Sequence, residues 1–139
     1  MGAIVVVLAA DSQRPCSEQA RRMLSRSPSR GAPALWHDRG IAVGIQTLDA
    51  DASLHYEREQ VVAFHGYIAN WRQILNGFSP ELKCAAVSDA ERVASLLRAN
   101  GLSAIAHLRG AFSIAIFSPL TRSLIIARDH IGLKPLFYQ

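Results

Sequence analysis

The chain has 139 residues, of which 50% are hydrophobic and 19% are charged, so it is long enough for one folded domain with its own core. This composition excludes a disordered chain, which would be poorer in hydrophobic residues. The formal net charge is +4, but the basic residues are scattered and are not interleaved with aromatic residues. We therefore expect no nucleic-acid partner.

Three apolar segments in the first half of the chain have the pattern of β-strands, at residues 4–9, 41–48 and 61–65. The first is a continuous β-branched run, which is typical of a strand buried on both faces. The third is predicted to end at Gly66 and to lead into a short helix near Asn70. Loops are predicted at residues 27–33 and 49–53, where polar residues gather.

Two helices are predicted from their caps. Ser17 is expected to cap a helix over residues 17–25, with an apolar stripe of Ala20, Met23 and Leu24. Ser88 and Glu91 have the spacing of a capping box, in which the serine hydroxyl accepts a hydrogen bond from the amide of Glu91. The helix that follows is expected to stop at Gly101 and to bury Val93, Leu96 and Leu97.

The last third of the chain predicts a β-hairpin. Residues 111–117 alternate between larger and smaller side chains, with Phe112, Ile114 and Ile116 on one side. Residues 118–122 form the turn and residues 123–128 the returning strand. Strands at both ends of the chain with helices between them indicate an α+β domain built on antiparallel sheets.

The cysteines and histidines give no sign of a metal site. Cys16 and Cys84 lie far apart and form no Cys-x-x-Cys pair, which argues against bound zinc or a disulfide framework. No two histidines or carboxylates have the spacing of metal ligands. The apolar run at the amino end is too short to cross a bilayer and lacks the basic flank of a signal peptide. We expect no metal, no membrane contact and a cytoplasmic location.

The hairpin resembles the class II glutamine amidotransferase domain at the amino end of asparagine synthetases. Residues 108–117 are similar to that family's Leu-x-Gly-x-Phe-Ala-Phe-Ala strand, and residues 127–138 to its Ala-Arg-Asp-x-x-Gly-x-x-Pro-Leu-Tyr return. Residues 65–70 and 88–91 are similar, less specifically, to its Asn-Gly-Glu-Ile-Tyr-Asn and Ser-Asp-x-Glu motifs. The resemblance covers residues 1–139 as one domain. It implies a four-layer αββα sandwich of two antiparallel sheets, the fold of the N-terminal-nucleophile hydrolases, here shortened after the hairpin.

In that family the nucleophile is a cysteine that becomes amino-terminal when the initiator methionine is removed, and its own α-amine acts as the base. This chain has Gly2 at that position. Cys16 and Cys84 cannot replace the missing nucleophile, because a mid-chain residue has no α-amine. The resemblance therefore implies a domain that has no catalytic residue and does not hydrolyse glutamine.

Other positions of the glutamine pocket also depart from the family pattern. His65 stands where the family has the asparagine of the oxyanion hole, although Gly66 is kept. Gly44 aligns with the arginine that binds the substrate carboxylate, and Arg30 belongs to a partial copy of the His-Arg-Gly-Pro-Asp loop. Asp89 matches the family's ligand for the glutamine amino group, and we interpret it here as a helix-capping residue.

The stretch that follows the hairpin carries a structural motif. Arg128, Asp129, Gly132 and Pro135 are predicted to form a chain reversal that is held by an Arg128–Asp129 ion pair and by fixed backbone dihedrals. The resemblance implies a structural role for these residues rather than a catalytic one.

The sequence contains neither a phosphate-binding loop of the Gly-x-x-x-x-Gly-Lys type nor a Ser-Gly-Gly-x-Asp pyrophosphate loop. In asparagine-synthetase relatives, ATP chemistry belongs to a separate carboxyl-terminal domain. The resemblance thus implies no cofactor in this chain, with ATP and Mg²⁺ in a synthetase domain outside it. That domain, or a separate synthetase chain, is the expected partner.

Front domains that have lost their glutaminase residues occur in lasso peptide cyclases and β-lactam synthetases. In both, ATP activates a carboxylate as an acyl-adenylate, and an amine of the same substrate attacks it. We favour a lasso peptide cyclase, with the precursor peptide and its processing proteins as further partners. Four alternatives stay open, namely the front domain of a β-lactam synthetase, that of an asparagine synthetase, a stand-alone protein-binding module, and a glutaminase whose cysteine has been replaced.

Overall fold

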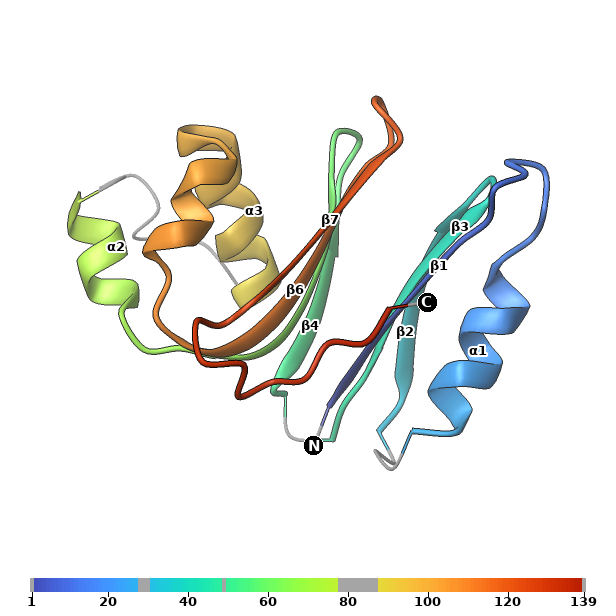
Figure 1. Ribbon diagram of the computed structural model, residues 1–139, viewed down its shortest axis with the longest axis horizontal. Coiled ribbons are helices and arrows are strands. Elements are labelled where there is room, and N and C mark those ends of the chain that lie inside the picture. The colour runs from blue at the N-terminus through green and yellow to red at the C-terminus, as the bar shows by residue number, and fades with distance from the viewer. Residues whose placement is uncertain (1, 28–30, 49, 78–87, 139) are drawn as a thin grey trace.

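The computed structural model describes residues 2–27, 31–48, 50–77 and 88–138. Two antiparallel sheets face each other, and helices cover the outer face of each sheet (Figure 1). The four layers follow one another in the order helix, sheet, sheet, helix. The predicted α+β fold, a layered sandwich of two antiparallel sheets, is confirmed. None of the helices in the described ranges is long and apolar enough to cross a membrane.

The first sheet has three strands in the order β1–β3–β2, which are β1 (Ala3–Leu8), β2 (Pro33–Asp38) and β3 (Ile41–Gln46). Helix α1 (Ser17–Ser25) packs on its outer face and buries Ala20 and Leu24. Strand β1 is not buried on both faces as predicted, because it lies at the edge of the sheet and most of its residues are half-buried. The predicted serine cap of α1 is also wrong, since Cys16 precedes the helix and its side chain makes no capping bond.

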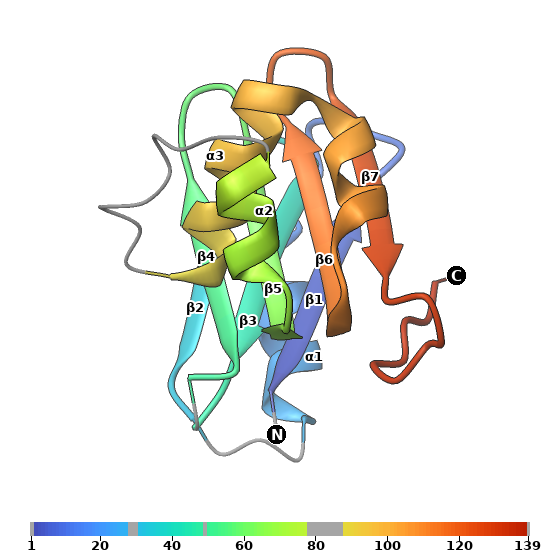
Figure 2. The ribbon, with the colours of Figure 1, turned by 90° about the vertical axis from the view of Figure 1, so that its left-hand side faces the viewer.

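The second sheet has four strands in the order β4–β5–β6–β7, which are β4 (Ala52–Tyr56), β5 (Val61–Ile68), β6 (Gly110–Ser118) and β7 (Ser123–Arg128). Its outer face is covered by helices α2 (Trp71–Gly77) and α3 (Asp89–Asn100) and by the 3₁₀ helix η2 (Leu102–His107) (Figure 2). Strands β6 and β7 are the predicted hairpin, and their bounds match the prediction closely.

Alternation along β6 divides the core between the two faces of the second sheet. Phe112, Ile114 and Ile116 belong to the cluster packed against α3, while Ala115 and Phe117 belong to the cluster between the sheets. The inter-sheet cluster also includes Ile41, Val43 and Ile45 from β3. This period of two is the expected consequence of successive strand residues pointing to opposite faces.

Two strands and one strand end differ from the prediction. Strands β2 and β4 were not predicted, and each begins inside a predicted loop, at Pro33 and at Ala52. Both carry polar residues and lie at the edges of their sheets. Strand β5 does not end at Gly66 but continues to Ile68, because Gly66 keeps its pairing with Phe112 at a φ of 117°. A glycine can adopt this φ without the steric cost that other residues meet.

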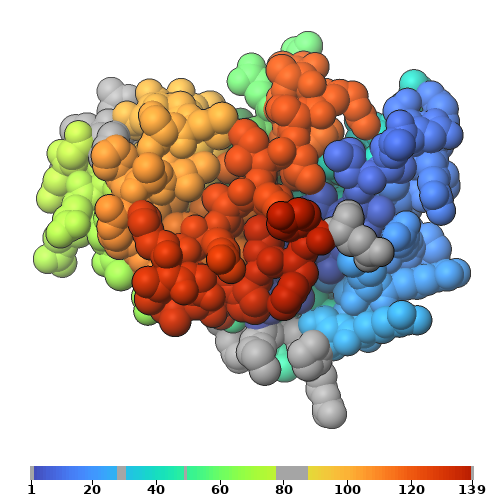
Figure 3. Space-filling view, viewed as in Figure 1, coloured from blue at the N-terminus to red at the C-terminus, as the bar shows by residue number. Residues whose placement is uncertain are grey.

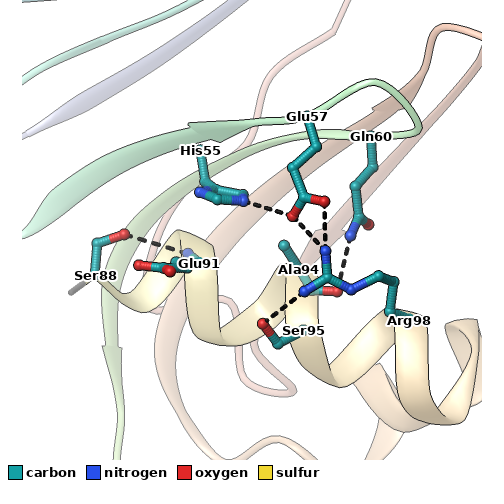
Figure 4. Close-up of polar contacts among 8 residues, drawn as sticks. All are labelled: His55, Glu57, Gln60, Ser88, Glu91, Ala94, Ser95 and Arg98. Carbon is teal, nitrogen blue, oxygen red and sulfur yellow. Dashed lines mark hydrogen bonds and ion pairs between the residues drawn. The ribbon is translucent and has the colours of Figure 1, made fainter. Parts of the chain in front are cut away.

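The predicted cap of α3 is confirmed, since the Ser88 hydroxyl accepts a hydrogen bond from the Glu91 amide at 3.2 Å. Val93, Leu96 and Leu97 are buried as expected. The hairpin of β4 and β5 is fastened to this helix by polar contacts (Figure 4). The buried amide of Gln60 donates to the Ala94 carbonyl at 2.8 Å, and Glu57 forms an ion pair with Arg98.

Candidate functional site at the amino end of β1

Gly2, Asp51, His65 and Lys134 meet at the amino end of β1, although they come from four separate segments. The Gly2 amide donates to Asp51 Oδ2 at 3.2 Å, and His65 Nε2 lies 3.2 Å from the same oxygen. Lys134 Nζ lies 3.2 Å from His65 Nε2 and 3.9 Å from Asp51 Oδ2. The sequence singled out Gly2 and His65, whereas Asp51 and Lys134 were missed as site residues.

Strand register explains why Asp51 and His65 meet. Ala52 at the start of β4 pairs with His65 of β5, so Asp51 stands directly beside the histidine. Along β5, Ala63 belongs to the cluster between the sheets and Phe64 to the cluster on the helix side. Since side chains alternate in a strand, His65 points toward the first sheet, where β1 begins.

Asp51 is held as a carboxylate. Its burial raises its pKa, but a hydrogen bond from the Thr47 hydroxyl at 2.5 Å and the nearby His65 lower it, and the net pKa lies below the ordinary value. Its two oxygens are shared, with Thr47 on Oδ1 and with Gly2 and His65 on Oδ2. The carboxylate therefore joins the loop before β4 to both sheets.

His65 has the opposite balance. Burial lowers the pKa of its ring, the charge of Lys134 lowers it further, and Asp51 raises it only in part. The net pKa lies below the usual histidine value, so the ring is mostly neutral near pH 7. A neutral imidazole beside a carboxylate can accept a proton and pass it on, as a general base does. Hydrolysis of an amide by the covalent route also needs a nucleophilic side chain, and Gly2 has none.

A side chain at the position of the family's nucleophile would crowd the Asp51 carboxylate. A β-carbon on Gly2 would lie 2.7 Å from Asp51 Oδ1, 3.0 Å from the Ala52 β-carbon and 3.0 Å from His65 Cδ2. The Gly66 amide, which the resemblance places in the oxyanion hole, donates to the Asp51 carbonyl at 2.6 Å. The Asp51 side chain therefore crowds the nucleophile position, and its backbone carbonyl binds the amide that the resemblance places in the oxyanion hole.

Lys134 reaches this cluster through the turn that follows β7. The segment after β7 runs along the surface of the molecule (Figure 3, dark red). The Asp129 carboxylate accepts hydrogen bonds from four backbone amides at 2.9–3.3 Å, those of Phe112, Ile131, Leu133 and Lys134. Burial raises the pKa of Asp129, but these four bonds outweigh it and lower the pKa to about 2.

The predicted ion pair between Arg128 and Asp129 is wrong. Among the ion pairs of the described residues, none joins these two side chains. The Arg128 guanidinium instead lies over Gly132, where a β-carbon would be 3.2 Å from its Cζ atom. Backbone amides rather than a side-chain cation hold the turn, and Pro135 directly follows the lysine that the turn positions.

Asp89 lies in the first turn of α3, where Ser88 and not Asp89 caps the helix. The Trp71 indole donates to Asp89 Oδ1 at 3.0 Å, and Arg92 Nη1 lies 3.2 Å from the same oxygen. Asp89 and Arg92 line a hollow of about 340 Å³ that also includes Ala50 and Ala52, the two neighbours of Asp51. The structure thus places Asp89 in a hollow whose lining includes none of Gly2, Asp51, His65 and Lys134.

Two further positions of the predicted glutamine pocket, Gly44 and Arg30, are not shown to lie at the cluster of Gly2, Asp51, His65 and Lys134. A side chain at Gly44 would meet Leu24 and Leu35, each at 2.8 Å, so it would point under α1 and not toward the other sheet. Arg30 lies outside the described residues. Within the part of the chain that the structure describes, no group of three or more His, Cys, Asp or Glu side chains could hold a metal ion.

Comparison with known proteins confirms the resemblance. The family model described as a glutamine amidotransferase domain matches residues 1–139. The glutamine-hydrolysing asparagine synthetase of Sandersonia aurantiaca is 32% identical over 127 residues, which are 86% of this chain and 24% of that protein. Asparagine synthetase B of Escherichia coli is 25% identical over 135 residues, covering 93% of this chain and 24% of its own length. The amidase chry2 of Gibberella zeae is 35% identical over 74 residues, or 53% of this chain and 11% of its own. The chain thus spans a quarter or less of these relatives.

Proposed function

Because the chain belongs to the family of glutamine amidotransferase domains, we propose that it is a front domain that does not hydrolyse glutamine and that supports an asparagine-synthetase-like ligase. The observation that carries the first half of this proposal is the closed space at Gly2, where Asp51 Oδ1 would lie 2.7 Å from a β-carbon. A nucleophilic side chain there would have to displace the Asp51 carboxylate.

The second half of the proposal rests on the relatives. Two of the proteins that this chain resembles are named asparagine synthetases, and the chain matches 24% of the length of each. We propose that ATP and Mg²⁺ act in a synthetase domain or a separate synthetase chain. A ligase whose amine comes from its own substrate has no need for ammonia, which would make glutamine hydrolysis dispensable.

Among such ligases we favour a lasso peptide cyclase, which would close an isopeptide bond through an acyl-adenylate in a precursor peptide. The domain would then support the synthetase half in the cytoplasm, with the peptide and its processing proteins as partners. A β-lactam synthetase would use the same chemistry on a small amino-acid-derived substrate.

Glutamate release from glutamine tests the first half. The chain with its initiator methionine removed and its Gly2→Cys variant are compared with buffer alone, and we expect neither to exceed background. A double variant, Gly2→Cys with Asp51→Ala, controls for crowding, because it removes the carboxylate that fills the space. Glutamine hydrolysis by the unmodified chain or by the single variant would overturn the proposal that this pocket is closed.

The intact mass of the protein from its native gene tests the second half. A mass several times 15.2 kDa supports a fused ligase, and a mass near that value turns the search to a separate synthetase that copurifies with it. The ligase is then incubated with ATP, Mg²⁺ and candidate precursor peptides. ATP-dependent loss of one water from a peptide supports a cyclase. Loss of water only from a small amino-acid substrate would replace it with the β-lactam reaction.

A further inference from the structure

One nitrogen of His65 lies within hydrogen-bonding distance of two groups, Asp51 and Lys134, but it cannot form a hydrogen bond with both at the same time. Asp51 Oδ2 and Lys134 Nζ each lie 3.2 Å from His65 Nε2. A carboxylate can only accept a hydrogen bond and an ammonium group can only donate one, whereas a ring nitrogen carries either a proton or a lone pair. At any moment Nε2 can therefore bind only one of its two neighbours.

From this geometry we propose that Asp51, His65 and Lys134 form a proton-controlled latch, in which protonation of His65 releases the Lys134 side chain. When the ring is neutral with its proton on Nδ1, Nε2 accepts a hydrogen bond from Lys134, whose ammonium group also lies 3.9 Å from Asp51 Oδ2. When a proton from solvent binds Nε2, that N–H donates to Asp51, and the imidazolium repels the lysine.

Each state leaves the Asp51 carboxylate with one side-chain cation. In the neutral state that cation is Lys134, and in the protonated state it is His65 itself, so the two cations exchange places at a single oxygen. Asp51 remains charged in both states, because its pKa lies below the ordinary value. The released lysine then presents a primary ammonium group to solvent beside the closed pocket at Gly2.

The charged groups around His65 come from three directions. Asp51 approaches from the segment before β4, Lys134 from the turn after β7, and the positive amino terminus also lowers the pKa of the ring. The cross-strand neighbours of His65 are Ala52 on β4 and Ser113 on β6, which add no charge. Because the net pKa of His65 is below its usual value, the latch is closed near neutral pH and opens in mild acid.

The backbone that carries Lys134 does not have to move. Its amide and two preceding amides of the turn donate to Asp129, whose pKa of about 2 keeps it charged through the range in which a histidine titrates. Only the lysine side chain therefore changes place. The latch acts as a local switch on the charge beside Gly2 and not as an unfolding of the turn.

Lysine and histidine side-chain NMR of the 139-residue chain tests this proposal, and Lys83 and Lys134 are the two lysines to assign. In a titration from about pH 7.5 to pH 4.5, which spans the ordinary histidine pKa, we expect the Lys134 ε-carbon and ammonium signals to change in one step. That step should coincide with the titration of His65, and the ring should change from the Nδ1–H tautomer to the doubly protonated form.

Two variants and one control decide the outcome. In His65→Gln the pH-dependent step of the Lys134 signals should be lost, whereas in His37→Gln, which alters an exposed histidine on β2, it should persist. In Lys134→Met the titration of His65 should move to higher pH, because a neighbouring positive charge has been removed. Lys134 signals that do not change in the unmodified chain, or that change equally in His65→Gln, would overturn the latch. The result is independent of any glutamine or ligase activity.

Discussion

Asp51 Oδ1 lies 2.7 Å from the point at which a β-carbon on Gly2 would stand, so a side chain on Gly2 would have to displace the Asp51 carboxylate. The second oxygen of the same carboxylate accepts a hydrogen bond from the Gly2 amide at 3.2 Å. Asp51 thus fills the space beside Gly2 and also fixes its backbone. The chain has glycine at this position, and the Asp51 carboxylate would crowd any side chain placed there.

Replacing Gly2 with alanine should destabilise the fold. The added methyl group would crowd Asp51, Ala52 and His65, and overpacking of this kind costs about 1–3 kcal/mol. Gly77→Ala is the matched control, because a β-carbon there meets nothing within 4 Å, and its effect should stay within about 0.5 kcal/mol. Urea unfolding of both variants measures the difference. Equal stabilities would contradict the crowding at Gly2.

Replacing Gly66 with alanine should be more severe. A β-carbon at Gly66 would lie 2.0 Å from the Ala111 carbonyl oxygen, at a φ of 117°, so the backbone itself would have to shift. We expect a loss of at least about 3 kcal/mol or failure to fold. Gly101→Ala provides the comparison, because its φ is 72° but a β-carbon meets nothing within 4 Å. Gly101→Ala should cost about 1–3 kcal/mol in thermal unfolding, from its backbone conformation alone.

The buried amide of Gln60 should contribute more to stability than the ion pair of Arg98 with Glu57. Gln60→Met removes the bond to the Ala94 carbonyl in a site that is 8% exposed, with an expected cost of about 1–2 kcal/mol. The side chains of Arg98 and Glu57 are 47% and 32% exposed, so solvent screens them, and Arg98→Met should cost less than about 1 kcal/mol. Urea midpoints in the opposite order would show that the ion pair dominates.

The turn after β7 should depend on the charge of Asp129. Asp129→Asn leaves fewer acceptor atoms for the four backbone amides, and it should lower the free energy of unfolding by about 2–4 kcal/mol at pH 7. Asp11→Asn is the control, because Asp11 is exposed and accepts one backbone amide bond. It should change the stability little.

The folded pKa of Asp129, about 2, lies below the unfolded value of about 3.9. Its contribution is therefore complete above about pH 4 and is lost as the pH falls toward 2. Unfolding free energies measured through this range should fall less steeply in Asp129→Asn than in the unmodified chain. Parallel curves would show that Asp129 does not account for the acid sensitivity.

The parts of the fold that the sequence predicts best are those with local signals. The hairpin of β6 and β7 follows from strict alternation, and α3 follows from the spacing of Ser88 and Glu91. Strands β2 and β4 have no such signal, since they are edge strands with half-exposed polar residues. Their strand conformation depends on the partner strand, which a local pattern does not contain.

The site is less predictable for the same reason. Gly2 and His65 stand at positions that the resemblance marks, but Asp51 lies in a polar loop and becomes a neighbour of His65 only through the register of β4 and β5. Lys134 is separated from His65 by 69 residues and is brought to it by the turn around Asp129. The one available signal was that Lys134 lies inside the motif between Gly132 and Pro135.

Four amides converge on the Asp129 carboxylate, and the stretch with the strongest family resemblance is built around that carboxylate. None of these four bonds is made by Gly2, Asp51 or His65, and the bond of Lys134 uses only its backbone amide, so the turn can form whether or not a nucleophile is present. The motif by which such a domain is most easily recognised is therefore a folding element. Finding it in another protein would identify an architecture, and the residue after the initiator methionine would have to be read separately to decide whether that protein is a glutaminase.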